Sequence, residues 1–201
     1  HEIRQPLGSR VKVRTYGARP QKIQIAEYRD SPHSTLQRIA SLVQDSQDNA
    51  RYCYDVRRFA LSILRGHEQG FDLSNDEKIA AVYYWMVQNA SYVNDPAFNE
   101  LIHSAEVLLD EYERNGIVTG DCDDFTILTC ALLLAVGVPC KARMIKVQQQ
   151  DGSMNWAHIY PMGLGSGSQW IAMDATEKDR FLGWQPHEGD NPSWRKDWDF
   201  A

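Results

Sequence analysis

Residues 125–136 are apolar at almost every position, and this run constrains the fold more than any other feature of the sequence. Its apolar members are Phe125, Ile127, Leu128, Ala131, Leu132, Leu133, Leu134, Ala135 and Val136. A helix that is apolar on every side lies in the middle of a domain, with other elements packed around it. Asp121 is placed to cap the start of this helix, and Gly137 and Pro139 end it. We therefore expect one domain built around a central buried helix.

The segments on either side of this run predict an α+β layout, with helices first and an antiparallel sheet after them. Hydrophobic periodicity indicates strands at residues 11–16 and 23–28 and helices at 34–43, 49–65, 74–93 and 104–112. The third of these helices begins with Ser74-Asn75-Asp76-Glu77, which is a capping-box pattern. Strands are expected at 142–149, 154–160 and 169–174. The first two of them are joined by Asp151-Gly152, a signal for a type I′ hairpin turn.

Length and charge limit the classes of function that fit this chain. A chain of 201 residues suits one domain with a full core, which we place at residues 34–186. We expect strands or an arm at 1–33 and a Trp-rich tail at 187–201. The net charge of −6 argues against nucleic acid as a partner. No stretch approaches the ~18 apolar residues of a membrane span, so we expect a cytoplasmic protein without a membrane partner.

Cys122 is expected just inside the start of the central helix, where free N–H groups and the helix dipole favour a negative charge. A thiol there has its pKa lowered toward the reactive range, and the thiolate is the nucleophilic form. Asp123 and Asp124 lie in the same first turn and oppose a second negative charge. The helix terminus alone is therefore insufficient, and Cys122 needs an imidazolium partner.

His158 and Asp174 are predicted to provide that partner from two neighbouring strands. If Ser166 is the centre of the Gly-rich loop, His158 lies directly opposite Asp174, with Cβ atoms roughly 5 Å apart. The carboxylate would then orient the imidazole, and Trp156 and Tyr160 would flank His158 on the same face. We interpret Cys122, His158 and Asp174 as a triad of nucleophile, base and orienting acid. The backbone N–H of Cys122 would supply one oxyanion donor.

Each of these residues taken alone has a simpler explanation. A single cysteine is more often a small core residue, a strand histidine is more often structural, and an aspartate at a strand end is usually a turn or cap residue. The matched positions of all three favour the functional interpretation. Cys53, Cys130 and Cys140 lack such a setting and are expected to be structural. There is no C-x-x-C pair, so we expect no metal site and no cofactor.

The same residues resemble the transglutaminase-like core of the papain-like cysteine protease superfamily. The likeness spans about residues 74–186 and rests on Gly120-Asp121-Cys122-Asp123-Asp124-Phe125, Val136-Gly137-Val138-Pro139-Cys140-Lys141-Ala142-Arg143, Ala157-His158-Ile159-Tyr160, Trp170-Ile171-Ala172-Met173-Asp174-Ala175-Thr176 and Tyr84-Trp85-Met86-Val87-Gln88-Asn89. It implies a papain-like fold in which Cys122, His158 and Asp174 carry thiol catalysis. It also implies a second oxyanion donor upstream of the cysteine, for which Gln88, Tyr92 and His103 are candidates. Trp156 and Tyr160 are groove candidates.

The C-terminal motifs Thr176-Glu177 and Gly183-Trp184-Gln185-Pro186 resemble transglutaminase-like proteins encoded among the structural genes of tailed phages. This narrower likeness implies host cytoplasm or a virion as the location, with virion or assembly proteins as partners. Three functions stay open: a hydrolase of peptide or isopeptide bonds, a glutamine–lysine cross-linking transglutaminase, and a non-enzymatic phage structural protein. In the third, the N-terminal strands and Trp184, Trp194 and Trp198 would be docking elements, unless the tail packs on its own domain.

Overall fold

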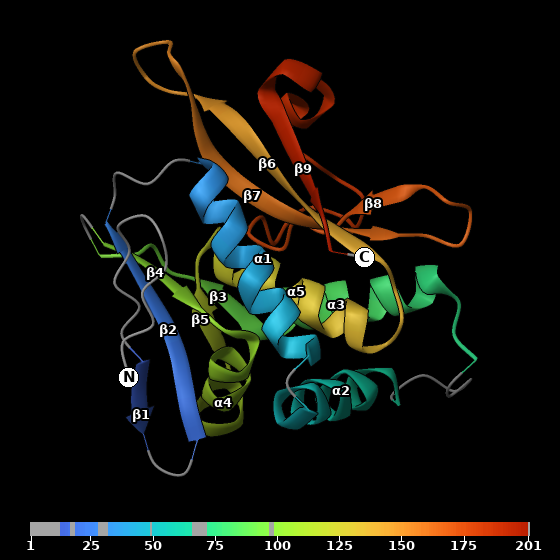
Figure 1. The fold of residues 1–201 in the computed structure, drawn as a ribbon. Coiled ribbons are helices and arrows are strands. Elements are labelled where there is room, and N and C mark those ends of the chain that lie inside the picture. Colours follow the sequence, from blue (N-terminus) through green and yellow to red (C-terminus); the bar gives the residue numbers. More distant parts are fainter. Residues whose placement is uncertain are drawn as a thin grey trace.

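The computed structural model describes residues 13–16, 19–27, 32–48, 50–65, 72–96 and 99–200. Helix α5 (Cys122–Ala135) crosses the middle of the molecule, with helices α1–α4 around it and a four-stranded sheet against its remaining side (Figure 1). All of its residues except Cys122 and Leu134 are buried. The expected central helix is therefore confirmed. No helix in these ranges combines the length and apolar character needed to cross a bilayer.

Four helices pack on α5, and they begin and end at recognisable signals. They are α1 (Pro32–Asp48), α2 (Ala50–Leu64), α3 (Asn75–Asn89) and α4 (Ala105–Asn115). The capping box at α3 is present: the Ser74 hydroxyl accepts from the Glu77 N–H at 3.3 Å, and Glu77 Oε2 accepts from the Ser74 N–H at 2.8 Å. Helix α4 runs past its expected end at Tyr112, because its stop signal is Gly116 in the left-handed region at φ 73°.

The sheet against α5 is antiparallel, with the strand order β8-β7-β6-β9. Its strands are β6 (Cys140–Gln148), β7 (Met154–Leu164), β8 (Trp170–Ala172) and β9 (Arg195–Asp199). One face packs on α5, and the other carries a small cluster of Ile145, Tyr160, Met162 and Ala172. Strand β9, from the segment expected as a Trp-rich tail, pairs with β6, and Trp198 packs against the main core.

The hairpin between β6 and β7 differs from the expected type I′ turn. That turn needs positive φ at both central residues, but in this loop only Gly152 has a positive φ, of 83°. The turn runs from Gln149 to Gly152, whose N–H donates to the Gln149 carbonyl at 2.9 Å. Asp151 instead accepts hydrogen bonds from the N–H and hydroxyl of Ser153, at 2.9 and 2.6 Å. This side-chain turn replaces the left-handed conformation that a type I′ turn requires of an aspartate.

The sequence analysis did not predict the short strands β3 (Ala90–Tyr92), β4 (Asn99–His103) and β5 (Val118–Gly120). Strands β3 and β5 pair in parallel, which brings Tyr92 beside Gly120. A separate antiparallel sheet contains β4 together with β1 (Val13–Tyr16) and β2 (Arg19–Glu27). Two of the strands expected in the arm at 1–33 are therefore found, and the rest of that arm up to residue 31 lies outside the described residues. The β3–β5 pair matters for function, because it ends at the start of α5.

Candidate active site

Cys122 occupies the first position of α5. The Asp121 side chain caps the helix by accepting from the Asp123 N–H at 3.1 Å, as expected. The Thr126 hydroxyl donates to the Cys122 carbonyl at 2.7 Å and holds the first turn. Gly120 is needed just before the cap, because a Cβ there would collide with the Asp124 carboxylate. The Gly-Asp-Cys pattern is thus explained by local packing and capping.

Cys122 is partly exposed as a residue and packs against the main core. Burial raises the pKa of this thiol well above its usual value, and the charges of Asp121, Asp123 and Asp174 raise it further. The Ile159 N–H acts in the opposite direction but does not outweigh them. The expected lowering of the Cys122 pKa is therefore wrong. Of the two aspartates expected to oppose a charge on Cys122, Asp123 raises the pKa and Asp124 is not among the main causes, while desolvation is the larger influence.

His158 and Asp174 form a direct hydrogen bond, with 2.7 Å between Nε2 and Oδ2. Asp174 is 2% exposed, and its Oδ1 accepts from the N–H and hydroxyl of Thr176 at 3.2 and 2.6 Å. Burial is the largest single influence on the pKa of Asp174 and raises it, but the bonds from His158 and Thr176 together hold this pKa below its usual value. An ionised Asp174 accepts a hydrogen bond from Nε2–H, which leaves Nδ1 of His158 as the ring nitrogen that can accept a proton.

The strand register that predicted this pair is nevertheless wrong. Met162 pairs with Ala172 and Leu164 with Trp170, so continuation of the ladder would place Tyr160, and not His158, opposite Asp174. The loop closes between Gly165 and Gln169, with Ser168 at a positive φ of 62°, so its centre lies one residue later than expected. Strand β8 ends at Ala172, and Asp174 reaches His158 diagonally from the segment beyond it.

A β-bulge separates Trp156 from His158. Ile145 pairs with His158 and Lys146 with Trp156, so Ala157 is an extra residue on β7. Since Ile145 and Lys146 point to opposite faces of the sheet, Trp156 and His158 do so as well. The Trp156 ring lies 5.2 Å from the Lys146 ammonium and packs against the main core. Trp156 is therefore not a neighbour of His158, contrary to the expected alternation.

Tyr160 does lie beside His158, with 5.8 Å between the ring centroids. It is fully buried, and its hydroxyl donates to Gln185 Oε1 at 3.1 Å. Arg143 donates to the same oxygen at 3.2 Å and forms two charge-assisted bonds to Asp197, of 2.7 and 2.8 Å. Tyr160 is thus a support that ties the loop around Gln185 to the sheet and not a groove residue.

An open pocket of about 440 Å³ contains His158 and Asp174. Its other lining residues are Tyr92, Val147, Thr176, Glu177, Trp184, Pro186 and Glu188. Of the candidates for groove or oxyanion roles, Tyr92 lies here. The sequence analysis did not assign Val147, Thr176, Glu177, Trp184, Pro186 or Glu188 to the site. The Asp174-x-Thr176 spacing is typical of a side-chain turn and could have revealed Thr176, whereas the others come from irregular chain without a periodic signal.

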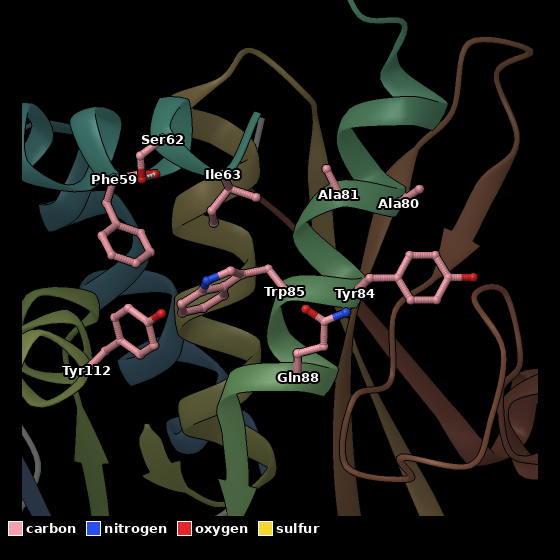
Figure 2. A pocket seen from close by; sticks show the side chains of 9 residues that line it. All are labelled: Phe59, Ser62, Ile63, Ala80, Ala81, Tyr84, Trp85, Gln88 and Tyr112. Atoms are coloured by element: carbon pink, nitrogen blue, oxygen red, sulfur yellow. Dashed lines mark hydrogen bonds between the residues drawn. The ribbon is translucent and has the colours of Figure 1, made fainter. Parts of the chain in front are cut away.

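Gln88 lies in a different place. It lines a second pocket, of about 640 Å³, together with side chains of α2, α3 and α4 (Figure 2). There Phe59, Trp85 and Tyr112 contact one another edge to face, with centroids 5.0–5.5 Å apart. This pocket shares no lining residue with the one at His158. Gln88 is therefore wrong as an oxyanion candidate, because α3 continues to Asn89 and turns this side chain toward the aromatic cluster.

His103 is bound to the central helix through Asp124. The His103 backbone N–H donates to Asp124 Oδ1 at 2.8 Å, and ring Nδ1 lies 3.1 Å from both carboxylate oxygens. Burial lowers the pKa of His103 most, but the bond to Asp124 and its charge outweigh burial and raise this pKa. His103 does not line the pocket, and its bonds to Asp124 fix the start of α5.

Three acidic residues cluster at the start of α5. Ligand oxygens of Asp121, Asp123 and Asp124 lie within 4.8 Å of one another, a spacing that a hard cation accepts. Asp121 and Asp124 already use oxygens in the cap and in the bond to His103.

Cys130 and Cys140 are fully buried, as expected for core residues. The Cys53 side chain lies outside the described residues.

Asp95 provides a test of the electrostatics near this end of the helix. Burial raises the pKa of Asp95 to about 6, helped by the charges of Asp121 and Asp124, although the Leu101 N–H and His103 oppose the shift. Folding therefore favours the protonated carboxyl. The resulting stability is fully present below the unfolded pKa of 3.8 and is lost as pH rises through about 6. We expect Asp95→Asn to gain about 1 kcal/mol relative to the native chain between pH 4 and 7, since solvent screens this half-exposed group.

Urea unfolding of both proteins across that pH range measures this difference. A ¹³C NMR titration of the Asp95 carboxyl carbon gives the pKa directly, and the Asp95→Asn variant assigns its resonance. A midpoint near the usual value for aspartate would contradict the arrangement described at this position.

The sequence matches the profile of one known protein family. The sequence profile of the transglutaminase-like superfamily matches residues 57–175, which is more than half of the chain and includes Cys122, His158 and Asp174. No curated protein matches the chain.

Two solved structures are similar to parts of this chain. A candidate cysteine protease from Cytophaga hutchinsonii has 16% identity and a TM-score of 0.46, over 89% of this chain and 59% of that protein. A candidate protease from Parabacteroides distasonis has 14% identity and a TM-score of 0.47, over 68% of this chain and 25% of that protein. The chain thus spans less than two thirds of either protein.

Proposed function

The chain belongs to the transglutaminase-like superfamily, and from this premise we propose that it is a cysteine hydrolase of peptide or isopeptide amide bonds. The observation that carries the proposal is the hydrogen bond of 2.7 Å between His158 and a buried, ionised Asp174, whose charge also acts on the thiol of Cys122 at the start of α5. A structural histidine needs no such partner inside an open pocket. A histidine that takes and returns a proton needs one to fix its tautomer and to stabilise its charged form.

The raised pKa of Cys122 determines how the first step proceeds. The resting thiol is protonated, so the nucleophile forms only as it reacts. As Cys122 Sγ attacks the carbonyl carbon, Nδ1 of neutral His158 takes the thiol proton, and Asp174 stabilises the imidazolium that results. The charge on the carbonyl oxygen is met by the backbone N–H of Cys122 at the helix start.

Tyr92 is our proposal for the second oxyanion donor. It is the candidate that lines the pocket with His158, and the β3–β5 pairing sets its backbone beside Gly120. Burial raises the pKa of the Tyr92 hydroxyl, and the charges of Cys122 and Asp121 raise it further. The phenol therefore keeps its proton and remains a donor at every working pH.

Collapse of the tetrahedral intermediate completes acylation. The C–N bond breaks, His158 delivers its proton to the leaving amine, and a thioester remains on Cys122. A water molecule then attacks the thioester with His158 as base, which releases a carboxylic acid and restores the thiol. The acceptor in this second step separates a hydrolase, which uses water, from a transglutaminase, which uses an amine.

The test follows the acyl group from p-nitrophenyl acetate, which reports acylation without knowledge of the natural substrate. We expect nitrophenol release, acetylation of Cys122 by mass spectrometry, and acetate as the main product even with methylamine present at saturation. N-methylacetamide as the main product would identify a transglutaminase instead. If Cys122 is never acetylated, both enzyme functions fail, and the non-enzymatic role in phage assembly becomes the better proposal.

A further inference from the structure

The pocket beside His158 carries an unbalanced negative charge. Asp174 is matched by His158, but the lining also contains the carboxylates of Glu177 and Glu188, and it contains no lysine or arginine. Trp184 and Pro186 supply apolar surface next to these carboxylates. We propose that this pocket is a specificity subsite for a lysine or arginine side chain of the substrate, close to the bond that is cleaved. This inference rests on the proposed function, since it assigns a substrate class to the same site.

Glu188 is the more constrained of the two carboxylates. Its side chain is 12% exposed and belongs to the short helix η1 (His187–Asp190). The carboxylate lies 3.2 Å from Nδ1 of His187, whose ring is 84% exposed. The following residue, Gly189, packs so closely on the Tyr160 hydroxyl that a side chain would not fit, which fixes η1 against the sheet. A mostly desolvated carboxylate held at a pocket wall is stabilised strongly by a cation that enters the pocket.

Four basic residues of the neighbouring sheet have partners outside the pocket, whereas Arg180 lies at Trp184. Arg143 and Lys141 bind Asp197 on β9 at 2.7 Å. Arg195 donates to the Gly189 carbonyl at 2.8 Å, and the Lys146 ammonium lies over Trp156, on the opposite face of the sheet from His158. Arg180 lies at the rim, with its guanidinium 4.7 Å from the centroid of the Trp184 ring. Among the described residues Glu177 forms no ion pair, and the only ion-pair partner of Glu188 is the exposed His187, so a substrate cation can reach both pocket carboxylates.

The lining of the pocket also matches the two chemical parts of a basic side chain, because it offers apolar surface and carboxylates. Lys and Arg bury their aliphatic stems on apolar surface and keep the charge at a polar end. Trp184 and Pro186 offer that surface, and the ring of Trp184 attracts a cation in its own right. The closeness of His158 ties occupancy of the pocket to the reacting atoms, so the preference should be visible in the rate of reaction at Cys122.

The test uses three alkylating probes that differ in side-chain charge: the chloroacetyl derivatives of lysine amide, norleucine amide and glutamate amide. In each, Cys122 Sγ displaces chloride to form a thioether. We expect the lysine probe to modify Cys122 about five- to tenfold faster than the norleucine probe, since two partly screened carboxylates act on one ammonium. The glutamate probe should be the slowest. Mass spectrometry of the Cys122 peptide measures each rate.

Variants distinguish the effect of the two pocket carboxylates on these rates from the effect of the protein's overall negative charge. Glu188→Gln and Glu177→Gln should each reduce the ratio of lysine to norleucine rates, and the double variant should bring it to about one. Glu113→Gln removes one charge from an exposed site on α4, outside the pocket, and should keep the ratio of the native protein. Equal rates for all three probes on a Cys122 that depends on His158 would overturn the subsite and leave the hydrolase intact. A Cys122 that reacts with none of them, or without need of His158, would instead contradict the proposed function.

Discussion

Replacing His158 with alanine is expected to slow the alkylation of Cys122 by iodoacetamide about a hundredfold or more, since a positioned general base contributes 10²–10⁴ to such a reaction. The reason lies in the thiol itself. Its raised pKa leaves almost no thiolate at rest, so the reaction depends on the proton that His158 removes. The rate is measured near neutral pH from the mass of the Cys122 peptide over time. The buried Cys130 and Cys140 serve as internal references that should stay unmodified in the folded protein.

Two further variants test the role assigned to each partner. Asp174→Asn leaves the imidazole in place but removes the carboxylate that fixes its tautomer, so an intermediate loss of rate is expected. His187→Ala removes an exposed imidazole outside the pocket lining and should leave the rate unchanged. If His158→Ala and His187→Ala react alike, His158 does not activate Cys122, and the hydrolase proposal loses its basis.

Replacing Asp124 with alanine is expected to reduce the free energy of unfolding by about 2–4 kcal/mol, because each buried donor left without an acceptor costs about 1–3 kcal/mol. Asp124 is 0% exposed and accepts from both the backbone N–H and the ring of His103. Its loss leaves those donors without an acceptor and opens a void beside Gly120. Urea unfolding followed by circular dichroism measures the change.

Two other substitutions in the same turn of helix provide a comparison for this loss of stability. Asp124→Asn keeps one acceptor for the His103 N–H and should cost less than the alanine variant. Asp121→Ala removes only the cap and should cost about 1 kcal/mol. A loss for Asp124→Ala no larger than that for Asp121→Ala would show that the bond to His103 does not anchor the start of α5.

The sequence predicted the central part of the molecule well, because its signals are local. The apolar run located α5, and Asp121 located its first turn, so Cys122 was placed correctly at the helix start. The capping box fixed α3 in the same way. His158 and Asp174 were expected to bond, and they do, although the reason offered for it was wrong.

What the sequence could not provide depends on pairing between distant segments. Ala157 forms a bulge only because β7 meets β6 in a particular register, so no local pattern separates Trp156 from His158. Strands β3 and β5 have three residues each, too few for an alternation to be recognised. The walls of the pocket come from irregular chain held by Gln185, whose partners Arg143 and Tyr160 lie more than twenty residues away.

The protonated thiol of Cys122 has a consequence for chemical durability. Peroxides oxidise cysteine through the thiolate, and the first product, a sulfenic acid, leads on to irreversible acids. Because burial and the adjoining aspartates raise the pKa of the thiol, we expect Cys122 to resist this damage in the resting protein. A nucleophile that forms only in the moment of attack can thus persist under oxidising conditions that would inactivate a permanent thiolate–imidazolium pair.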